Sequence, residues 1–142
     1  RAVRLLDIHT ACIDVDDSSR CFGFSAAFDC GSQEEIFSFC ADAVSAATSG
    51  EDVCILAHGQ TGAGKTYTMY GPDLRDACFS GIVPRFVLAL FACESVEEVT
   101  VSMLENIPGD KLLDLLCEDG FRKPEVKLRW NGGSVILEDV IE

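Results

Sequence analysis

Residues 59–66 constrain this chain more than any other part of its sequence. Three of these eight residues are glycines, and glycine adopts backbone conformations with positive φ that other residues rarely reach. The segment follows an apolar run of strand length at 52–57 and precedes a plausible helix beginning at Lys65. This order predicts an α/β fold, a layered sheet with helices on both faces, in which residues 52–57 form a central strand.

The glycine-rich segment matches the P-loop pattern G-x-x-x-x-G-K-[ST] at every fixed position. In such a loop backbone N–H groups point at phosphate oxygens, the lysine reaches the β- and γ-phosphates, and the hydroxyl ligates Mg²⁺. We therefore predict a P-loop NTPase fold that binds Mg·ATP, with Thr66 as the magnesium ligand and no residue assigned to catalysis. The predicted binding residues are Gly59, Gln60, Thr61, Gly62, Ala63, Gly64, Lys65 and Thr66.

The charge of the chain argues against two classes of partner. Asp and Glu outnumber Lys and Arg by 24 to 11, which gives a net charge of −13. Nucleic acids and anionic lipid surfaces both need a positive footprint on the protein. No apolar run approaches the roughly 20 residues of a membrane-spanning helix. We therefore expect neither a nucleic acid nor a membrane as partner, and the basic contacts for an acidic protein surface should lie mostly outside this chain.

Eight cysteines are scattered along the sequence without a C-x-x-C pair, and there are only two histidines. This spacing does not fit a zinc site or a disulfide framework. Most of the cysteines stand in apolar stretches, as buried free thiols do. We predict structural, reduced cysteines and a reducing compartment.

Several strands are indicated by alternation and turn residues. Short strands are expected at 11–15 and 21–24, and another at 99–104. Strands at 126–130 and 135–137 flank Asn131-Gly132, a strong hairpin signal because this pair accepts positive φ.

Helices are indicated by capping residues and apolar spacing. Ser32 and Glu35 fit a capping box, and apolar residues at helical spacing then continue through 36–47 until Gly50 stops the helix. Pro84 stands where the first turn of a further helix tolerates it.

The sequence also resembles a known family in four collinear places. Residues 58–69 read HGQTGAGKTYTM, which resembles the kinesin P-loop, and residues 81–85 resemble the G-I-[IV]-P-R that follows it. Upstream, Phe24, Phe28-Asp29 and Gln33 with Ile36-Phe37 resemble F-D-x-V-F followed by Q-x-x-[VI]-[FY]. Downstream, residues 101–105 and 114–116 resemble V-S-[YF]-L-E and D-L-L.

This resemblance implies that residues 1–142 are a partial kinesin motor domain with its P-loop at 59–66. The family couples ATP hydrolysis to movement on microtubules, so ATP, Mg²⁺ and microtubules are the implied ligands and the cytoplasmic cytoskeleton the implied location. Tyr67 matches a position beside the adenine, although a plain helix-face tyrosine is an equal interpretation. A truncated or degenerate motor that serves as a non-catalytic nucleotide-binding or interaction module is the alternative.

Departures from the family pattern limit what this chain is expected to do. Residues 106–110 diverge from the family's I-Y-N-E, and no R-x-R-P stretch precedes Cys12. The switch motifs N-x-x-S-S-R-S-H and D-L-A-G-S-E do not occur, nor do the main microtubule-contacting elements that follow them. We therefore expect a piece of a longer protein, without efficient hydrolysis by itself. Asp139 superficially suits a magnesium-holding strand, but its place after the hairpin favours an edge hairpin instead.

Overall fold

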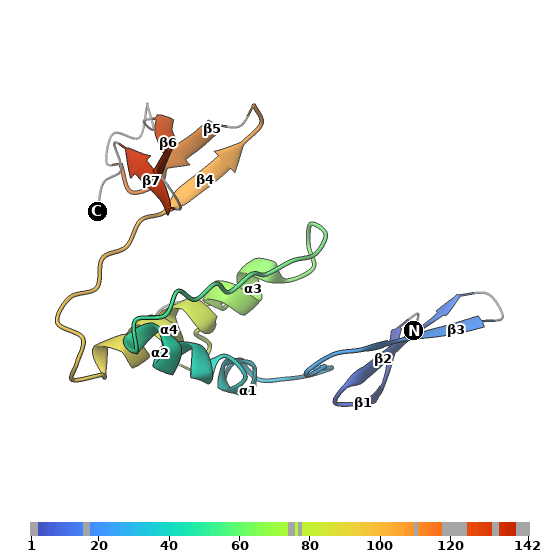
Figure 1. Cartoon of the computed structure of the whole chain (residues 1–142). Coiled ribbons are helices and arrows are strands. Elements are labelled where there is room, and N and C mark those ends of the chain that lie inside the picture. Colours follow the sequence, from blue (N-terminus) through green and yellow to red (C-terminus); the bar gives the residue numbers. More distant parts are fainter. Residues whose placement is uncertain are drawn as a thin grey trace. The chain divides into compact units, whose positions relative to one another are not determined.

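The computed structural model describes residues 3–15, 18–73, 76, 78–109, 111–117, 125–131 and 134–138. The chain divides into two compact units, Arg1–Val96 and Glu97–Glu142, which are followed from the N-terminus to the C-terminus in Figure 1.

The first unit begins with an antiparallel three-stranded sheet. Its strands are β1 (Val3–Asp7), β2 (Thr10–Val15) and β3 (Ser18–Gly23), paired in the order β1-β2-β3. The strands predicted at 11–15 and 21–24 are thus confirmed as β2 and β3, with β3 beginning three residues earlier. Asp16 and Asp17, which stand between β2 and β3 in the sequence, lie outside the described residues.

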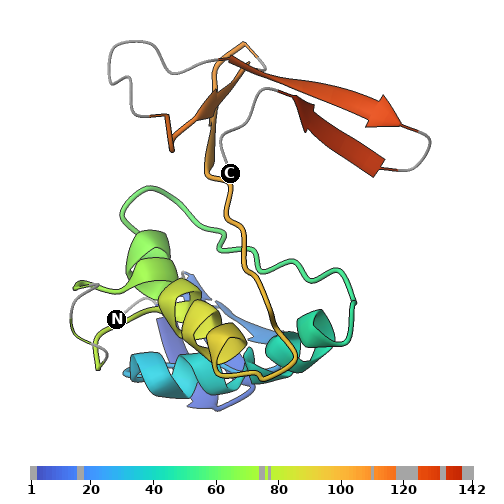
Figure 2. The same cartoon turned by 90° about the vertical axis from the view of Figure 1, so that its left-hand side faces the viewer.

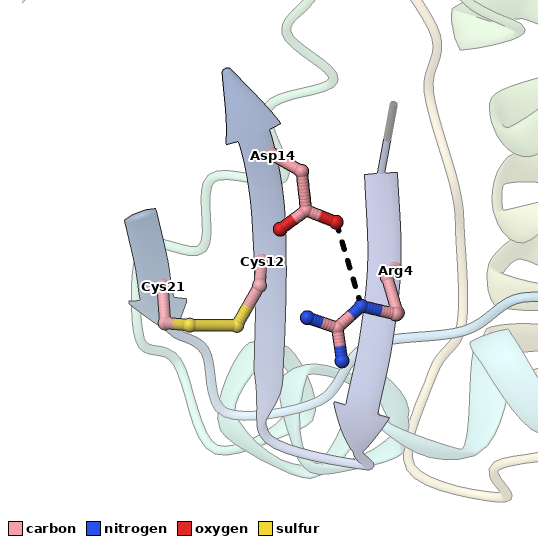
Figure 3. Close-up of polar contacts among 4 residues, drawn as sticks. All are labelled: Arg4, Cys12, Asp14 and Cys21. Atoms are coloured by element: carbon pink, nitrogen blue, oxygen red, sulfur yellow. Dashed lines mark ion pairs between the residues drawn. A yellow bond between two sulfur atoms is a disulfide. The ribbon is translucent and has the colours of Figure 1, made fainter. Parts of the chain in front are cut away.

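A disulfide between Cys12 and Cys21 joins β2 to β3, as Figure 3 shows. The two residues are direct partners in the antiparallel register, and side chains at such positions lie next to each other on one face of the sheet. The prediction that the cysteines are reduced is therefore wrong for this pair. It failed because two scattered cysteines become neighbours only through the strand register. On the same face, Arg4 Nε lies 3.6 Å from Asp14 Oδ2.

The predicted capping box is confirmed at the start of α1 (Gln33–Ser38). The Ser32 hydroxyl accepts from the Glu35 amide at 3.1 Å, and the Ser32 amide donates to the Glu35 carboxylate at 2.7 Å. The second of these bonds is the main cause of a lowered pKa of the exposed Glu35 carboxyl. The beginning of this helix is therefore fixed by two local hydrogen bonds.

The apolar spacing at 36–47 belongs to two helices and not to one. After α1 the chain makes tighter bonds from Phe39 N–H to the Ile36 carbonyl and from Cys40 N–H to the Phe37 carbonyl, and α2 (Ala41–Thr48) follows. These i→i+3 bonds, 3.3 and 2.8 Å long, interrupt the α-helical ladder. The predicted stop is confirmed, because Gly50 has a φ of 86° and its N–H donates to the Ala47 carbonyl.

The middle of the chain forms two further helices, α3 (Lys65–Tyr70) and α4 (Ile82–Phe91). Pro84 lies in the first turn of α4, as predicted. This helix contacts α1, α2 and α3, and the four helices gather in one group in Figure 2. Among the described residues, Ile82 at the start of α4 is one of three buried hydrophobic residues.

Residues 52–57, predicted as a central strand, are not a strand in this structure. They form an extended stretch between α2 and α3 that pairs with no strand of the described chain. Leu56 is 82% exposed. Apolar composition favours a buried strand, but a strand forms only when neighbours bond its backbone groups.

The second unit is an antiparallel four-stranded sheet in the order β4-β5-β6-β7. The hairpin predicted around Asn131 is confirmed, because Asn131 pairs with Ser134; Gly132 and Asp139 lie outside the described residues. The strand predicted at 99–104 is wrong up to Met103, since residues 99–103 belong to no strand of the structure. The strands are β4 (Leu104–Ile107), β5 (Lys111–Asp114), β6 (Glu125–Asn131) and β7 (Ser134–Glu138).

Candidate functional site

The glycine-rich loop takes the backbone conformations that its glycines allow. Gly59, Gly62 and Gly64 have φ angles of 150°, 81° and 89°, which are strained for residues with a Cβ atom. The Ala63 N–H donates to the Gln60 carbonyl at 3.1 Å and closes a turn between them. These backbone angles and this hydrogen bond all lie within residues 59–64.

The space beside the loop is open. A Cβ atom placed on Gly62 or Gly64 would meet no protein atom within 4 Å, and residues 59–64 are exposed. These two glycines are therefore required by their backbone angles and not by packing against protein. Open space therefore lies directly beside both glycines.

Lys65, the first residue of α3, folds back across the loop. Its Nζ donates to the carbonyls of Gly59 and Gln60, at 2.9 Å in both cases. An ammonium group has three N–H donors, so these two bonds leave one for an anion. The contact places a positive charge directly over the glycine-rich loop.

The next two residues are accessible from solvent. Thr66 is exposed on the first turn of α3, and Tyr67 is 53% exposed. This exposure is compatible with a plain tyrosine on the helix face as well as with a contact with the base, so the base contact stays a prediction. The structure brings all predicted residues, 59–67, together because they are consecutive.

Sequence reasoning did not assign Gln33 to this site, although the structure connects it to α3. Its Nε2 donates to the Tyr67 carbonyl at 2.8 Å, across 34 positions of sequence. Gln33 is 5% exposed. The only signal at this position was a family motif, which does not say what the glutamine contacts.

The far end of α3 rests against the start of α4. The Gly81 N–H donates to the Tyr70 carbonyl at 3.1 Å. A Cβ atom on Gly81 would lie 2.6 Å from the Met69 carbonyl carbon and 2.7 Å from the Gly71 nitrogen. Only a glycine allows the two segments to approach this closely.

An apolar cavity of about 210 Å³ lies between the extended stretch 52–57 and the helices α3 and α4. It is open to the outside. Its lining residues are Val53, Ile55, Met69, Ile82, Val83, Phe86 and Val87.

The described residues contain neither a cluster of metal-binding side chains nor a membrane-spanning helix. No group of three or more His, Cys, Asp or Glu side chains there could hold a metal ion. In the same part of the chain, no helix has the length and apolar character needed to span a bilayer.

Comparison with known proteins identifies a family for nearly the whole chain. The family model described as the kinesin motor domain matches residues 7–142. Carboxy-terminal kinesin 2 of Xenopus laevis is 38% identical over 125 residues, which cover 78% of this chain and 19% of that protein. Kinesin-like protein KIN-14F of Arabidopsis thaliana is 37% identical over 111 residues, covering 73% and 10%. The chain thus spans between a tenth and a fifth of these relatives.

A solved structure agrees with the sequence comparison. The structure of a fast kinesin, described for its ATPase mechanism and its interactions with microtubules, matches with a TM-score of 0.85 and 26% sequence identity. The match covers 99% of this chain and 41% of that one. The predicted α/β P-loop NTPase class is therefore confirmed, although its central strand is not formed within the described residues. This chain belongs to the kinesin motor domain family.

Proposed function

We propose that this chain binds Mg·ATP through residues 59–66 and supplies the nucleotide-binding part of a motor that couples ATP hydrolysis to movement along microtubules. The observation that carries the proposal is the shape of the loop, with three glycines at positive φ and the Lys65 ammonium held across it. Kinesin motor domains in general use a nucleotide with Mg²⁺, which supports the assignment.

Each part of the loop has a distinct proposed role. The N–H groups of residues 59–64 would bind phosphate oxygens beside the open space at Gly62 and Gly64. Lys65 would exchange its bonds to the loop carbonyls for bonds to the β- and γ-phosphates, which are stronger because both partners are charged. Thr66 would ligate the Mg²⁺ ion, and Tyr67 would lie beside the base.

The proposed role of these residues is to bind and orient the nucleotide. We assign no catalytic residue within the chain. We propose that residues 1–142 form a single partial motor domain. Bound magnesium would neutralise charge on the phosphates. Microtubules are the proposed partner and the cytoplasmic cytoskeleton the proposed location; neither a nucleic acid nor a membrane is proposed.

The test is the substitution Lys65→Ala in the natural protein that contains this chain. We expect the affinity for ADP carrying a fluorescent group on its ribose to fall about tenfold to a hundredfold, the range set by losing one charged hydrogen-bonding group. Microtubule-stimulated phosphate release from ATP should be lost. The control is Lys127→Ala, because Lys127 is an exposed lysine on β6 in the second unit.

The outcomes separate the proposal from its alternative. Binding of the labelled ADP together with microtubule-stimulated phosphate release supports a motor. Binding without stimulated release favours a non-catalytic nucleotide-binding module. Absence of binding, or equal loss in Lys65→Ala and Lys127→Ala, would overturn the assignment of the loop.

A further inference from the structure

The helix that carries Lys65 and Thr66 is too short to be stable by itself. α3 has six residues, whereas isolated helices of fewer than about 12 residues are marginal in water. The last four carbonyls of a helix also have no partner within it. What holds the end of α3 therefore decides how firmly the P-loop is held.

Among the described residues, two contacts from elements other than α3 and its C-terminal cap satisfy carbonyls of this helix. One is the Gly81 N–H at the Tyr70 carbonyl, which comes from the start of α4. The other is Gln33 Nε2 at the Tyr67 carbonyl, which also accepts from the Gly71 N–H at 2.9 Å. Only the Gln33 contact is made by a side chain, so it can be removed without changing the backbone.

Gln33 is itself held in place. It is the first residue of α1, directly after Ser32, and the capping box with Glu35 fixes the backbone there. Its side chain is buried, and burial restricts the rotamers that it can adopt. A fixed backbone and a restricted side chain make Gln33 a rigid support.

The chemistry of the amide group determines its orientation. An amide has one end that donates and one that accepts, and the Tyr67 carbonyl can only accept. The NH₂ end must therefore face Tyr67, which directs Oε1 the other way. Oε1 is buried and has no hydrogen-bond partner within the described chain. Leaving such an acceptor unsatisfied opposes stability, so Gln33 is not explained by its contribution to the core.

We propose that Gln33 is a positioning residue for the P-loop helix: it ties the last turn of α3 to α1 and so holds Lys65 and Thr66 in their binding geometry. This inference rests on the proposed nucleotide site. It assigns Gln33 no contact with the nucleotide, only an effect through the backbone of α3.

The test compares Gln33→Met with the matched control Glu34→Ala, an exposed neighbour on the same turn of α1. Methionine keeps the length of the side chain and removes both polar atoms. In the natural protein we expect the affinity for ribose-labelled fluorescent ADP to fall about fivefold, the ratio that one neutral hydrogen bond supports. Hydrogen exchange in residues 65–71, followed by mass spectrometry, should accelerate. The control should change neither.

Thermal unfolding separates positioning from a structural role. The Tyr67 carbonyl keeps its bond from Gly71, and the unsatisfied Oε1 disappears. We therefore expect the unfolding midpoint of Gln33→Met to change by no more than about 2 °C. A second variant, Gln33→Asn, keeps the amide group but shortens the side chain by one methylene, so that the amide no longer reaches the Tyr67 carbonyl. It should show the same loss of affinity for labelled ADP.

Three results would overturn the inference. The first is unchanged affinity and exchange in Gln33→Met. The second is a loss of affinity that follows a matching loss of thermal stability in both variants, which would mean a structural role only. The third is a native affinity in Gln33→Asn. If the unsubstituted protein does not bind labelled ADP, the proposed function fails, and exchange in residues 65–71 still decides whether Gln33 holds α3.

Discussion

Two adjacent segments of this chain differ in what they need in order to adopt their structure. The P-loop at 59–66 is formed by bonds between its own residues, such as Ala63 N–H to the Gln60 carbonyl and Lys65 Nζ to the Gly59 carbonyl. The apolar stretch at 52–57 is extended and, within the described chain, pairs with no strand. The two segments are separated by His58 alone.

The difference shows which features of a sequence determine local structure without help from distant residues. A glycine at positive φ and a lysine that bonds its own loop act over a few residues, and so the shape of the loop depends mainly on its own residues. A buried strand depends on backbone partners far away in sequence. A glycine-rich loop of this kind can therefore take its shape where the strand before it pairs with no other strand of the described chain.

A large effect on stability is expected where the P-loop helix meets α4. In the 142-residue chain, Gly81→Ala should lower the free energy of unfolding by about 1–3 kcal/mol, because the new Cβ would lie 2.6 Å from the Met69 carbonyl carbon and the backbone must shift. The backbone angle is not the cause, since φ at Gly81 is −79°. Denaturant unfolding measures the change.

Gly23→Ala is the matched control for that substitution. Gly23 ends β3, and a Cβ atom there would meet nothing within 4 Å. Equal stability of Gly81→Ala and the unsubstituted chain would contradict the close approach of α3 and α4.

The smallest effect is expected in the unpaired stretch. In the same chain, Leu56→Ser should change the free energy of unfolding by less than about 0.5 kcal/mol, because Leu56 is 82% exposed. Ile82→Ser, at a position 5% exposed, should cost about 2–4 kcal/mol by comparison. A cost at Leu56 close to that at Ile82 would show that residues 52–57 are buried in a sheet, and it would remove the contrast between the segments.

Features that depend on neighbouring residues could be predicted from the sequence. The glycine conformations of the P-loop, the capping box of Ser32 and Glu35, the stop at Gly50 and the hairpin after Asn131 all act within a few positions. Each is a hydrogen-bond or backbone-angle requirement that the local residues meet by themselves. The structure confirms each of them within the described residues.

Features that depend on pairing could not be predicted in the same way. The Cys12–Cys21 disulfide requires the register of β2 and β3, and the bond from Gln33 to the Tyr67 carbonyl joins residues 34 positions apart. Apolar spacing also did not show that residues 36–47 contain a break, because the bonds at Phe39 and Cys40 keep the apolar face in phase while they end one helix. Whether residues 52–57 pair in a sheet depends on which other strands lie beside them. The spacing of apolar residues within the segment contains no information about those strands.

The central claim, that residues 59–66 bind the nucleotide, is tested most directly by hydrogen exchange with and without Mg·ADP. Exchange would be followed by mass spectrometry in this chain and in its Lys65→Ala variant. The account predicts that Mg·ADP slows exchange in residues 59–66, that residues 52–57 keep their exchange rate, and that Lys65→Ala abolishes the protection. Unchanged exchange in residues 59–66 at saturating Mg·ADP, or protection that survives Lys65→Ala, would contradict it.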